Sequence, residues 1–156
     1  MNKIIFVLFF ITSFNALSAG TSSNKTDEVD NSNQINILYQ RAENYIANKD
    51  FKKSIKVLKG LTKREDLSGF RADIYNLLGY SYRKIDKPNL DKSFAAYMMA
   101  LEINPNHIGA HEYLGELYLT LGKKEKAIEM LNRLKILIGV QADEYIDLKE
   151  AIENYS

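Results

Sequence analysis

Two histidines one helical turn apart are the side chains in this sequence that most resemble a reactive site. His107 and His111 are four positions apart, and Glu112 and Glu116 follow them. On a helix, residues at this spacing share a face, which is the geometry of helical zinc sites with a glutamate as general base. Such a site needs a third ligand, and the chain has only these two histidines. A metal-dependent protein using His107 and His111 is therefore the less favoured interpretation, and we expect no metal and no cofactor.

Glu112 and Glu116 are also candidates for paired acid–base carboxylates. They are expected to lie one turn apart on an exposed stripe, where no burial shifts their pKa values towards neutrality. The chain contains no cysteine, which excludes disulfides, thiol nucleophiles and thiolate metal sites. The sequence therefore predicts a protein that is not an enzyme.

Composition and charge narrow the possible fold and function classes of the protein. A chain of 156 residues suits one domain, and its hydrophobic fraction of 46% and charged fraction of 26% are typical of a globular protein. Lysine and arginine total 21 against 20 acidic residues, so no large basic field attracts nucleic acid. Only two prolines interrupt a sequence rich in helix-forming residues, which predicts an all-α fold.

The first 33 residues have the pattern of a targeting segment followed by a flexible spacer. Lys3 precedes the apolar run 4–11, and small residues follow at 16–19. This order predicts a secretory signal peptide over 1–19, cleaved after Ser18 or Ala19, because the apolar run is shorter than the roughly 20 residues of a membrane span. We expect the mature protein to be periplasmic or secreted, without stable membrane insertion. Residues 20–33 contain one valine and predict a disordered spacer.

The rest of the chain is repetitive. Segments 76–82 and 112–118 both carry Leu-Gly with a tyrosine three residues after the glycine, and the glycines Gly79 and Gly115 are 36 residues apart. A weaker copy at Ala42 and Tyr45 precedes them. We expect three helix-turn-helix units at about 34–68, 72–106 and 108–141, with a helix at 143–156 covering the apolar face of the last unit.

Side chains at helical spacing assign the packing within each unit. Small residues are expected where the two helices of a unit cross, because the backbones can approach closely there. They are Ala42 with Ser54, Gly79 with Ser93 and Ala100, and Gly115 with Ala127. His111 and most tyrosines should be core residues, namely Tyr45, Tyr75, Tyr82, Tyr97, Tyr118 and Tyr145.

Two segments resemble a known repeat family. Tyr97-x-x-Ala100-Leu101-Glu102-Ile103-Asn104-Pro105 and Leu114-Gly115-x-x-Tyr118 are similar to the tetratricopeptide repeat, and the resemblance covers about 35–139. It implies an all-α solenoid of stacked helix pairs that binds protein segments. The first unit departs from the family pattern with Arg41 for leucine and Ala42 for glycine. The layout as a whole resembles small exported tetratricopeptide repeat proteins of Gram-negative bacteria, which implies a periplasmic location.

The first helix of each unit has a second stripe that points away from the packing residues. The resemblance implies that this stripe lines a concave groove, in which aromatic side chains anchor a bound segment and polar ones set its register. We expect Tyr80 and Arg83 to contribute most to binding and little to folding, and the glutamates to favour a partner with lysine or arginine. The candidate site residues are Tyr39, Glu43, Asn76, Tyr80, Arg83, Glu112 and Glu116.

The function expected from these observations is that of an exported adaptor or assembly factor, which binds protein or peptide segments in this groove. The alternative is a self-associating structural protomer of an envelope complex, in which the groove or an unfilled end of the stack binds another copy. The identity of the partner does not follow from the sequence.

Overall fold

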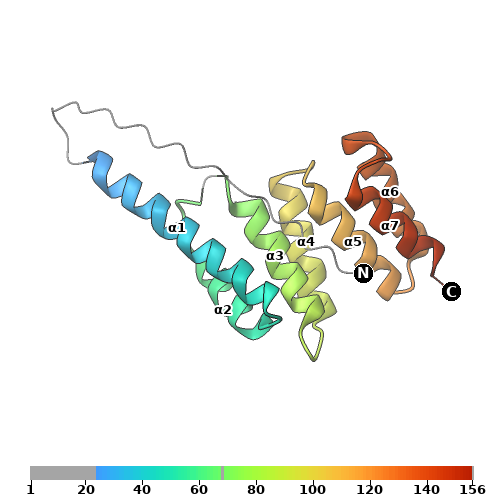
Figure 1. Cartoon of the computed structure of the whole chain (residues 1–156), viewed down its shortest axis with the longest axis horizontal. Coiled ribbons are helices and arrows are strands. Elements are labelled where there is room, and N and C mark those ends of the chain that lie inside the picture. Colours follow the sequence, from blue (N-terminus) through green and yellow to red (C-terminus); the bar gives the residue numbers. More distant parts are fainter. Residues whose placement is uncertain (1–23, 68, 156) are drawn as a thin grey trace.

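The computed structural model describes residues 24–67 and 69–155, and within them the chain forms seven α-helices and no strand (Figure 1). The predicted signal peptide at 1–19 and the first residues of the spacer lie outside the described residues. The predicted all-α class is confirmed. The helices are α1 (Asn24–Ala47), α2 (Phe51–Leu61), α3 (Arg71–Lys84), α4 (Leu90–Ile103), α5 (Ile108–Thr120), α6 (Lys124–Ile138) and α7 (Asp143–Glu153).

The helices form two layers of a short solenoid. Helices α1, α3, α5 and α7 lie side by side, each in contact with the next, while α2, α4 and α6 pack behind them (Figure 1). Each pair α1–α2, α3–α4 and α5–α6 is one helix-turn-helix unit, and the next unit packs against it. The predicted solenoid of three units with a closing helix is therefore confirmed.

Local sequence explains where the helices begin and end. The side chain of Asn89 accepts the backbone N–H of Lys92 at 3.0 Å and so caps α4 after Pro88. Gly122 joins α5 to α6 with a φ of +71°, a conformation that glycine adopts without strain. The sequence thus sets the turns that bring each second helix back onto the first.

The glycine of the second unit marks a close helix crossing. A Cβ atom at Gly79 would lie 2.6 Å from the ring of Tyr97, which is fully buried, and Oγ of Ser93 donates to the carbonyl of Gly79 at 2.8 Å. The predicted contact between Gly79 and Ser93 is confirmed. Helices α3 and α4 therefore touch along their backbones, as the small residues predicted.

The glycine of the third unit has an additional role. A Cβ atom at Gly115 would lie 2.5 Å from a methyl group of Leu148, on α7. The sequence paired Gly115 only with Ala127, which is indeed fully buried in the core between α5, α6 and α7. Gly115 thus also makes room for Leu148 of the closing helix. Residue spacing within one unit does not predict this contact.

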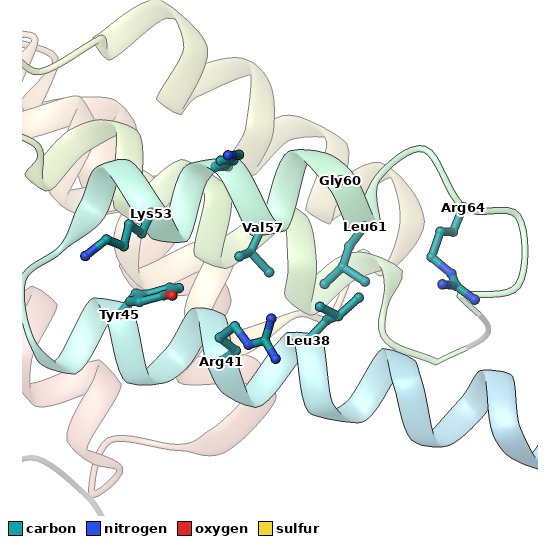
Figure 2. Close-up of a pocket in the computed structure, with 9 residues that line it drawn as sticks. Leu38, Arg41, Tyr45, Lys53, Val57, Gly60, Leu61 and Arg64 are labelled. Carbon is teal, nitrogen blue, oxygen red and sulfur yellow. The ribbon is translucent and has the colours of Figure 1, made fainter.

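The tyrosines follow the predicted packing with one exception. Tyr75, Tyr82, Tyr97, Tyr118 and Tyr145 all belong to or pack against the three core clusters, which run from α1 to α7. Tyr45 does not, because it lies in a surface cavity between α1 and α2 (Figure 2). The assignment of Tyr45 to the core is therefore wrong.

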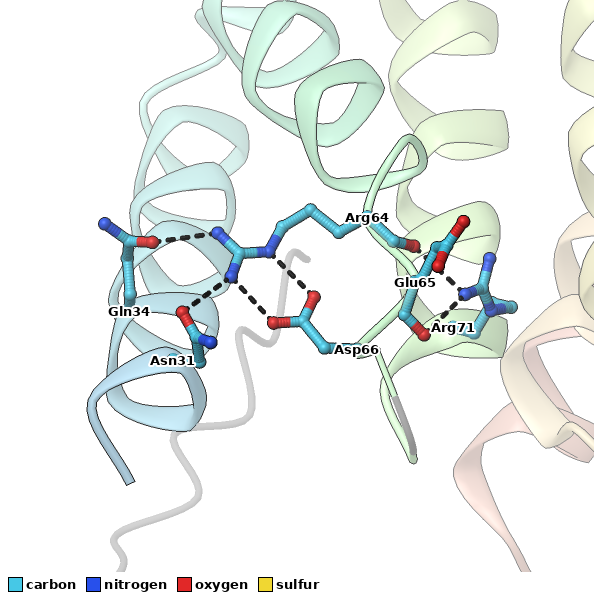
Figure 3. Close-up of polar contacts among 6 residues, drawn as sticks. All are labelled: Asn31, Gln34, Arg64, Glu65, Asp66 and Arg71. Carbon is cyan, nitrogen blue, oxygen red and sulfur yellow. Dashed lines mark hydrogen bonds and ion pairs between the residues drawn. The ribbon is translucent and has the colours of Figure 1, made fainter. Parts of the chain in front are cut away.

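Helix α1 begins earlier than the sequence indicates. The structure places residues 24–33 in this helix, where a disordered spacer was expected. Arg64, in the α2–α3 connection, reaches across to the side chains of Asn31 and Gln34 at 3.3 and 2.8 Å (Figure 3). Once one part of a helix is anchored, each further residue adds a hydrogen bond, so a polar segment can extend it. None of the helices of the described residues is long and apolar enough to cross a membrane.

Candidate functional site

The seven predicted site residues all lie on the layer formed by α1, α3, α5 and α7, which we call the inner-helix face. Tyr39 and Glu43 come from α1, Asn76, Tyr80 and Arg83 from α3, and Glu112 and Glu116 from α5. Their interactions join successive helices of this layer. Two groups of side chains result, one centred on Arg83 and the other on Asp73.

The central cluster (Tyr80, Arg83, Glu112, Tyr113 and Glu116) joins α3 to α5. The guanidinium group of Arg83 forms an ion pair with the carboxylate of Glu116, and only 9% of the Arg83 side chain is exposed. It lies 5.8 Å from the ring centroids of both Tyr80 and Tyr113, which are 5.1 Å from each other. A desolvated guanidinium between two aromatic rings and a carboxylate is held rigidly. The cluster therefore fixes how the second and third units stack.

Glu112 is the most perturbed carboxyl group of this cluster. Burial, helped by the negative charges of Glu116, Glu144 and Asp147, raises its pKa from an ordinary 4.5 to about 8, while Arg83 opposes the rise. The residue is only 7% exposed. Glu112 is therefore mostly protonated at neutral pH, because its charged form is poorly solvated. The expectation that this stripe offers no burial to shift a pKa is wrong.

A pH-dependent stability follows from the raised pKa of Glu112. Unfolded chains lose the Glu112 proton near pH 4.5 and folded ones keep it to about pH 8, so the contribution of Glu112 to the free energy of unfolding falls as the pH rises through that range. We expect Glu112→Gln to have a melting temperature close to that of the wild type near pH 4.5, and a progressively higher one up to pH 8. Thermal unfolding monitored by circular dichroism measures this. Glu102→Gln, at an exposed position on α4, is the control and should follow the wild type. A pH-independent difference for Glu112→Gln would contradict the assignment.

The second group lies towards the N-terminal side of the inner-helix face. Tyr39 packs on Phe70, and the centroids of their rings are 5.4 Å apart. The pKa of Tyr39 is raised by burial and by the charges of Glu43 and Asp73. Burial and the charge of Asp73 also raise the pKa of Glu43. Because Asp73 affects both residues of α1, the first and second units bring their acids together. This half of the face is acidic, and Asp73 was not among the predicted site residues.

His107 links the second unit to the third. Its Nδ1 accepts the backbone N–H of Ala110 at 3.1 Å, so the proton lies on Nε2, which donates to Asp73 at 3.0 Å. His107 is thus the cap of α5. The sequence placed His107 in the connection after Pro105. In the structure this residue also contacts Asp73 of the second unit.

His111 packs in the interior, as predicted. It is 6% exposed, and its Nε2 donates to the carbonyl of Pro105 at 2.9 Å. Burial lowers its pKa, so the ring is neutral at pH 7. The Nε2 atoms of both histidines therefore carry protons and serve as hydrogen-bond donors. Within residues 24–67 and 69–155, no three His, Cys, Asp or Glu side chains come together in a way that could hold a metal ion.

Asn76 is, like Glu112, a predicted site residue that is buried and not an exposed groove position. It is 7% exposed, and a Cβ atom at Gly109 would lie 3.0 Å from its amide nitrogen. The missing side chain of Gly109 makes room for Asn76 between α3 and α5. Asn76, Arg83 and Glu112 are therefore contacts between units as well as parts of the face.

The expectation that Tyr80 and Arg83 contribute little to folding is wrong. Arg83 holds its ion pair in a nearly buried site, and the half-buried ring of Tyr80 packs on Phe51 and Tyr113. Sequence reasoning also missed Tyr113. Its place directly after Glu112 puts it about 100° round the helix from the stripe, between the stripe and the packing side. A large aromatic residue at this border of the stripe was the feature of the sequence that could have identified Tyr113 as part of the site.

Two models of the tetratricopeptide repeat family match the sequence, at residues 72–107 and 96–129. Among curated proteins, tetratricopeptide repeat protein 37 of Xenopus laevis is 29% identical over 92 residues, and anaphase-promoting complex subunit CDC16 of Saccharomyces cerevisiae is 29% identical over 122 residues. These alignments cover 59% and 78% of this chain, which spans only 6% and 14% of the two relatives.

Solved structures share the fold. MamA has a TM-score of 0.63 at 22% identity, covering 83% of this chain and 72% of MamA. The first tetratricopeptide repeat domain of Spaghetti (RPAP3), bound to the HSP90 peptide SRMEEVD, has a TM-score of 0.65 at 15% identity and coverages of 78% and 93%. The Yersinia enterocolitica type III secretion chaperone SycD, in complex with a peptide of the translocator YopD, has a TM-score of 0.63 at 17% identity and coverages of 79% and 89%.

Sequence and structure agree on the repeat. The family models cover the second unit and most of the third, and the α1–α2 pair repeats the same helix-turn-helix arrangement. The chain therefore contains tetratricopeptide repeats, which the family models place at residues 72–129.

Proposed function

We propose that this protein is an exported tetratricopeptide repeat module that binds segments of other proteins on its inner-helix face, as an adaptor or assembly factor. The observation that carries the proposal is the central cluster. There, a half-buried Tyr80 and the partly exposed Glu116 are held in place by Arg83 and Tyr113. A rigid aromatic beside a fixed carboxylate is the kind of anchor that dominates peptide binding.

Charge on this face indicates the class of partner. Glu43, Asp73, Glu116, Glu144 and Asp147 lie on its four helices, and the charge of Arg83 is matched by its ion pair with Glu116. Acidic segments would meet like charge here, so we propose a segment that carries lysine or arginine beside an apolar residue. Related folds supply the precedent of peptide binding, since RPAP3 and SycD were solved with bound peptides. An acidic peptide such as SRMEEVD does not suit the face of this protein.

The test replaces exposed acids of the face and leaves the central cluster intact. Glu43→Gln with Asp147→Asn removes two negative charges at exposed positions. We expect this variant to lose at least about tenfold in affinity for partners captured from the envelope fraction, with an unchanged melting temperature. The matched control, Asp86→Asn with Glu102→Gln, removes two exposed acids from the turn and the second helix of the middle unit. If both variants captured partners equally well, the inner-helix face would not be the binding surface.

Export is the second part of the proposal and rests on residues 1–19. Their charge, apolar run and small residues favour cleavage after Ser18 or Ala19. We expect the protein recovered from the envelope fraction to begin at Ala19 or Gly20, which its intact mass will report. A recovered chain that still contains residues 1–19 would contradict cleavage.

A further inference from the structure

The first unit leaves an apolar trough open at the N-terminal end of the stack. A cavity of about 600 Å³ lies between α1 and α2, with the rest of the chain behind these two helices (Figure 2). Its apolar lining includes Leu38, Val57 and Leu61, and Tyr45 closes one end. Helices α1 and α2 contact α3 on one side only, so this trough is the surface that a preceding unit would cover in a longer solenoid.

Basic side chains surround this trough, namely Arg41, Lys53, Lys56 and Arg64. Lys53 is paired with Asp50 at 2.5 Å and Arg64 with Asp66 at 2.8 Å, whereas Arg41 and Lys56 form no ion pair within the described residues. Helix α2 carries four lysines and no acid. A second cavity of about 410 Å³ beside it is lined by Lys52, Lys56, Lys59 and Lys63. The trough and the adjoining lysine-rich side of α2 are therefore positively charged.

The opposite end of the stack carries the opposite charge. Helix α7 contacts α5 and α6, and it buries Leu148 and Ile152 against them. Helical spacing places Asp143, Ile146, Glu150 and Glu153 on the other side of the helix. This outer side has three acids, one apolar residue and no basic residue, and Asp147 lies at its border with the inner-helix face. Lys149 lies at its border, where it pairs with Glu153 at 3.4 Å.

We propose that copies of this protein associate end to end, with the outer side of α7 of one copy lying in the α1–α2 trough of the next. Ile146 would enter the apolar trough, and the carboxylates around it would face Arg41, Lys53, Lys56 and Arg64. The two ends are complementary in charge although the chain as a whole has a net charge of only +1. Because the contact joins different surfaces, it does not close on itself and extends into a row of copies.

Two single-ended variants test the contact. Arg41→Glu with Lys56→Glu reverses the charge of the trough at exposed positions without ion pairs, and Glu150→Lys with Glu153→Lys reverses the outer side of α7. We expect the mass of the wild-type protein in light scattering to rise with concentration, with an association constant about tenfold lower in 0.5 M than in 0.05 M salt. Each variant alone should be monomeric. The control, Lys87→Glu with Lys92→Glu in the middle unit, should associate like the wild type.

Mixing the two variants separates this geometry from any other self-association. The trough variant keeps a normal α7 and the α7 variant keeps a normal trough, so an equimolar mixture should associate although neither variant does so alone. A monomeric wild-type protein, unchanged association of either variant, or a mixture that does not associate would each overturn the proposal. The four substitutions leave the inner-helix face acids Glu43 and Asp147 in place. Partner capture should therefore survive in both variants, and failure of end-to-end association leaves the proposed function standing.

Discussion

Removing residues 143–156 is expected to unfold the third unit or to lower the melting temperature of the whole protein by at least about 10 °C. Leu148 and Ile152 of α7 are 0% and 7% exposed, and partly buried Tyr145 and Tyr155 pack on the same core. Exposing each fully buried side chain costs roughly 1.5 to 3 kcal/mol, against a total stability of about 5 to 15 kcal/mol for a small domain. Gly115 and the buried Leu119 of α5 would then face water.

A single substitution measures the same contact without deleting the helix. Leu148→Ala should lower the free energy of unfolding by about 2 to 5 kcal/mol in urea denaturation, because the Leu148 side chain fills the space that Gly115 leaves open. Lys149→Ala, at the next and exposed position, should change it by less than about 0.5 kcal/mol. An unchanged melting temperature after deletion of 143–156 would mean that α7 is not a structural cap.

Breaking the ion pair between Arg83 and Glu116 is expected to have the next largest effect. Arg83→Met should lower the free energy of unfolding by about 3 kcal/mol, because Glu116 would be left without its partner beside Glu112. The lost contacts with the rings of Tyr80 and Tyr113 add to this. Replacing both partners, with Arg83→Met and Glu116→Leu, should recover most of the loss, because no uncompensated charge then remains in the contact. Urea denaturation of the four proteins of this cycle measures the coupling.

The exposed ion pair of α6 provides the matched control. Lys126 and Glu129 are 2.9 Å apart, and their side chains are 53% and 55% exposed, compared with 9% and 26% for Arg83 and Glu116. The same cycle with Lys126→Met and Glu129→Leu should show a much smaller coupling, because solvent screens this pair. Equal coupling in the two cycles would contradict the structural role assigned to Arg83.

The repeat pattern in the sequence determines the architecture of this protein. Small residues at Ala42, Gly79 and Gly115, with Asn89 and Gly122 at the turns, predict three helix pairs because their effects are local. A glycine permits close approach and a cap ends a helix, whatever surrounds the unit. The amphipathic pattern of α7 likewise predicts a closing helix, because an apolar side must be covered.

The contacts between units are decided only by the tertiary structure. A stripe on α3 has the same helical spacing whether it faces solvent or the side of α5, so sequence spacing alone made Asn76, Arg83 and Glu112 appear exposed. Burial by the neighbouring helix is what raises the pKa of Glu112 and seats Arg83 between two tyrosines. The separation of charge between the ends has the same origin. Nearly equal numbers of acids and bases conceal it in the composition, and stacking places the lysines of α2 and the acids of α7 at opposite ends.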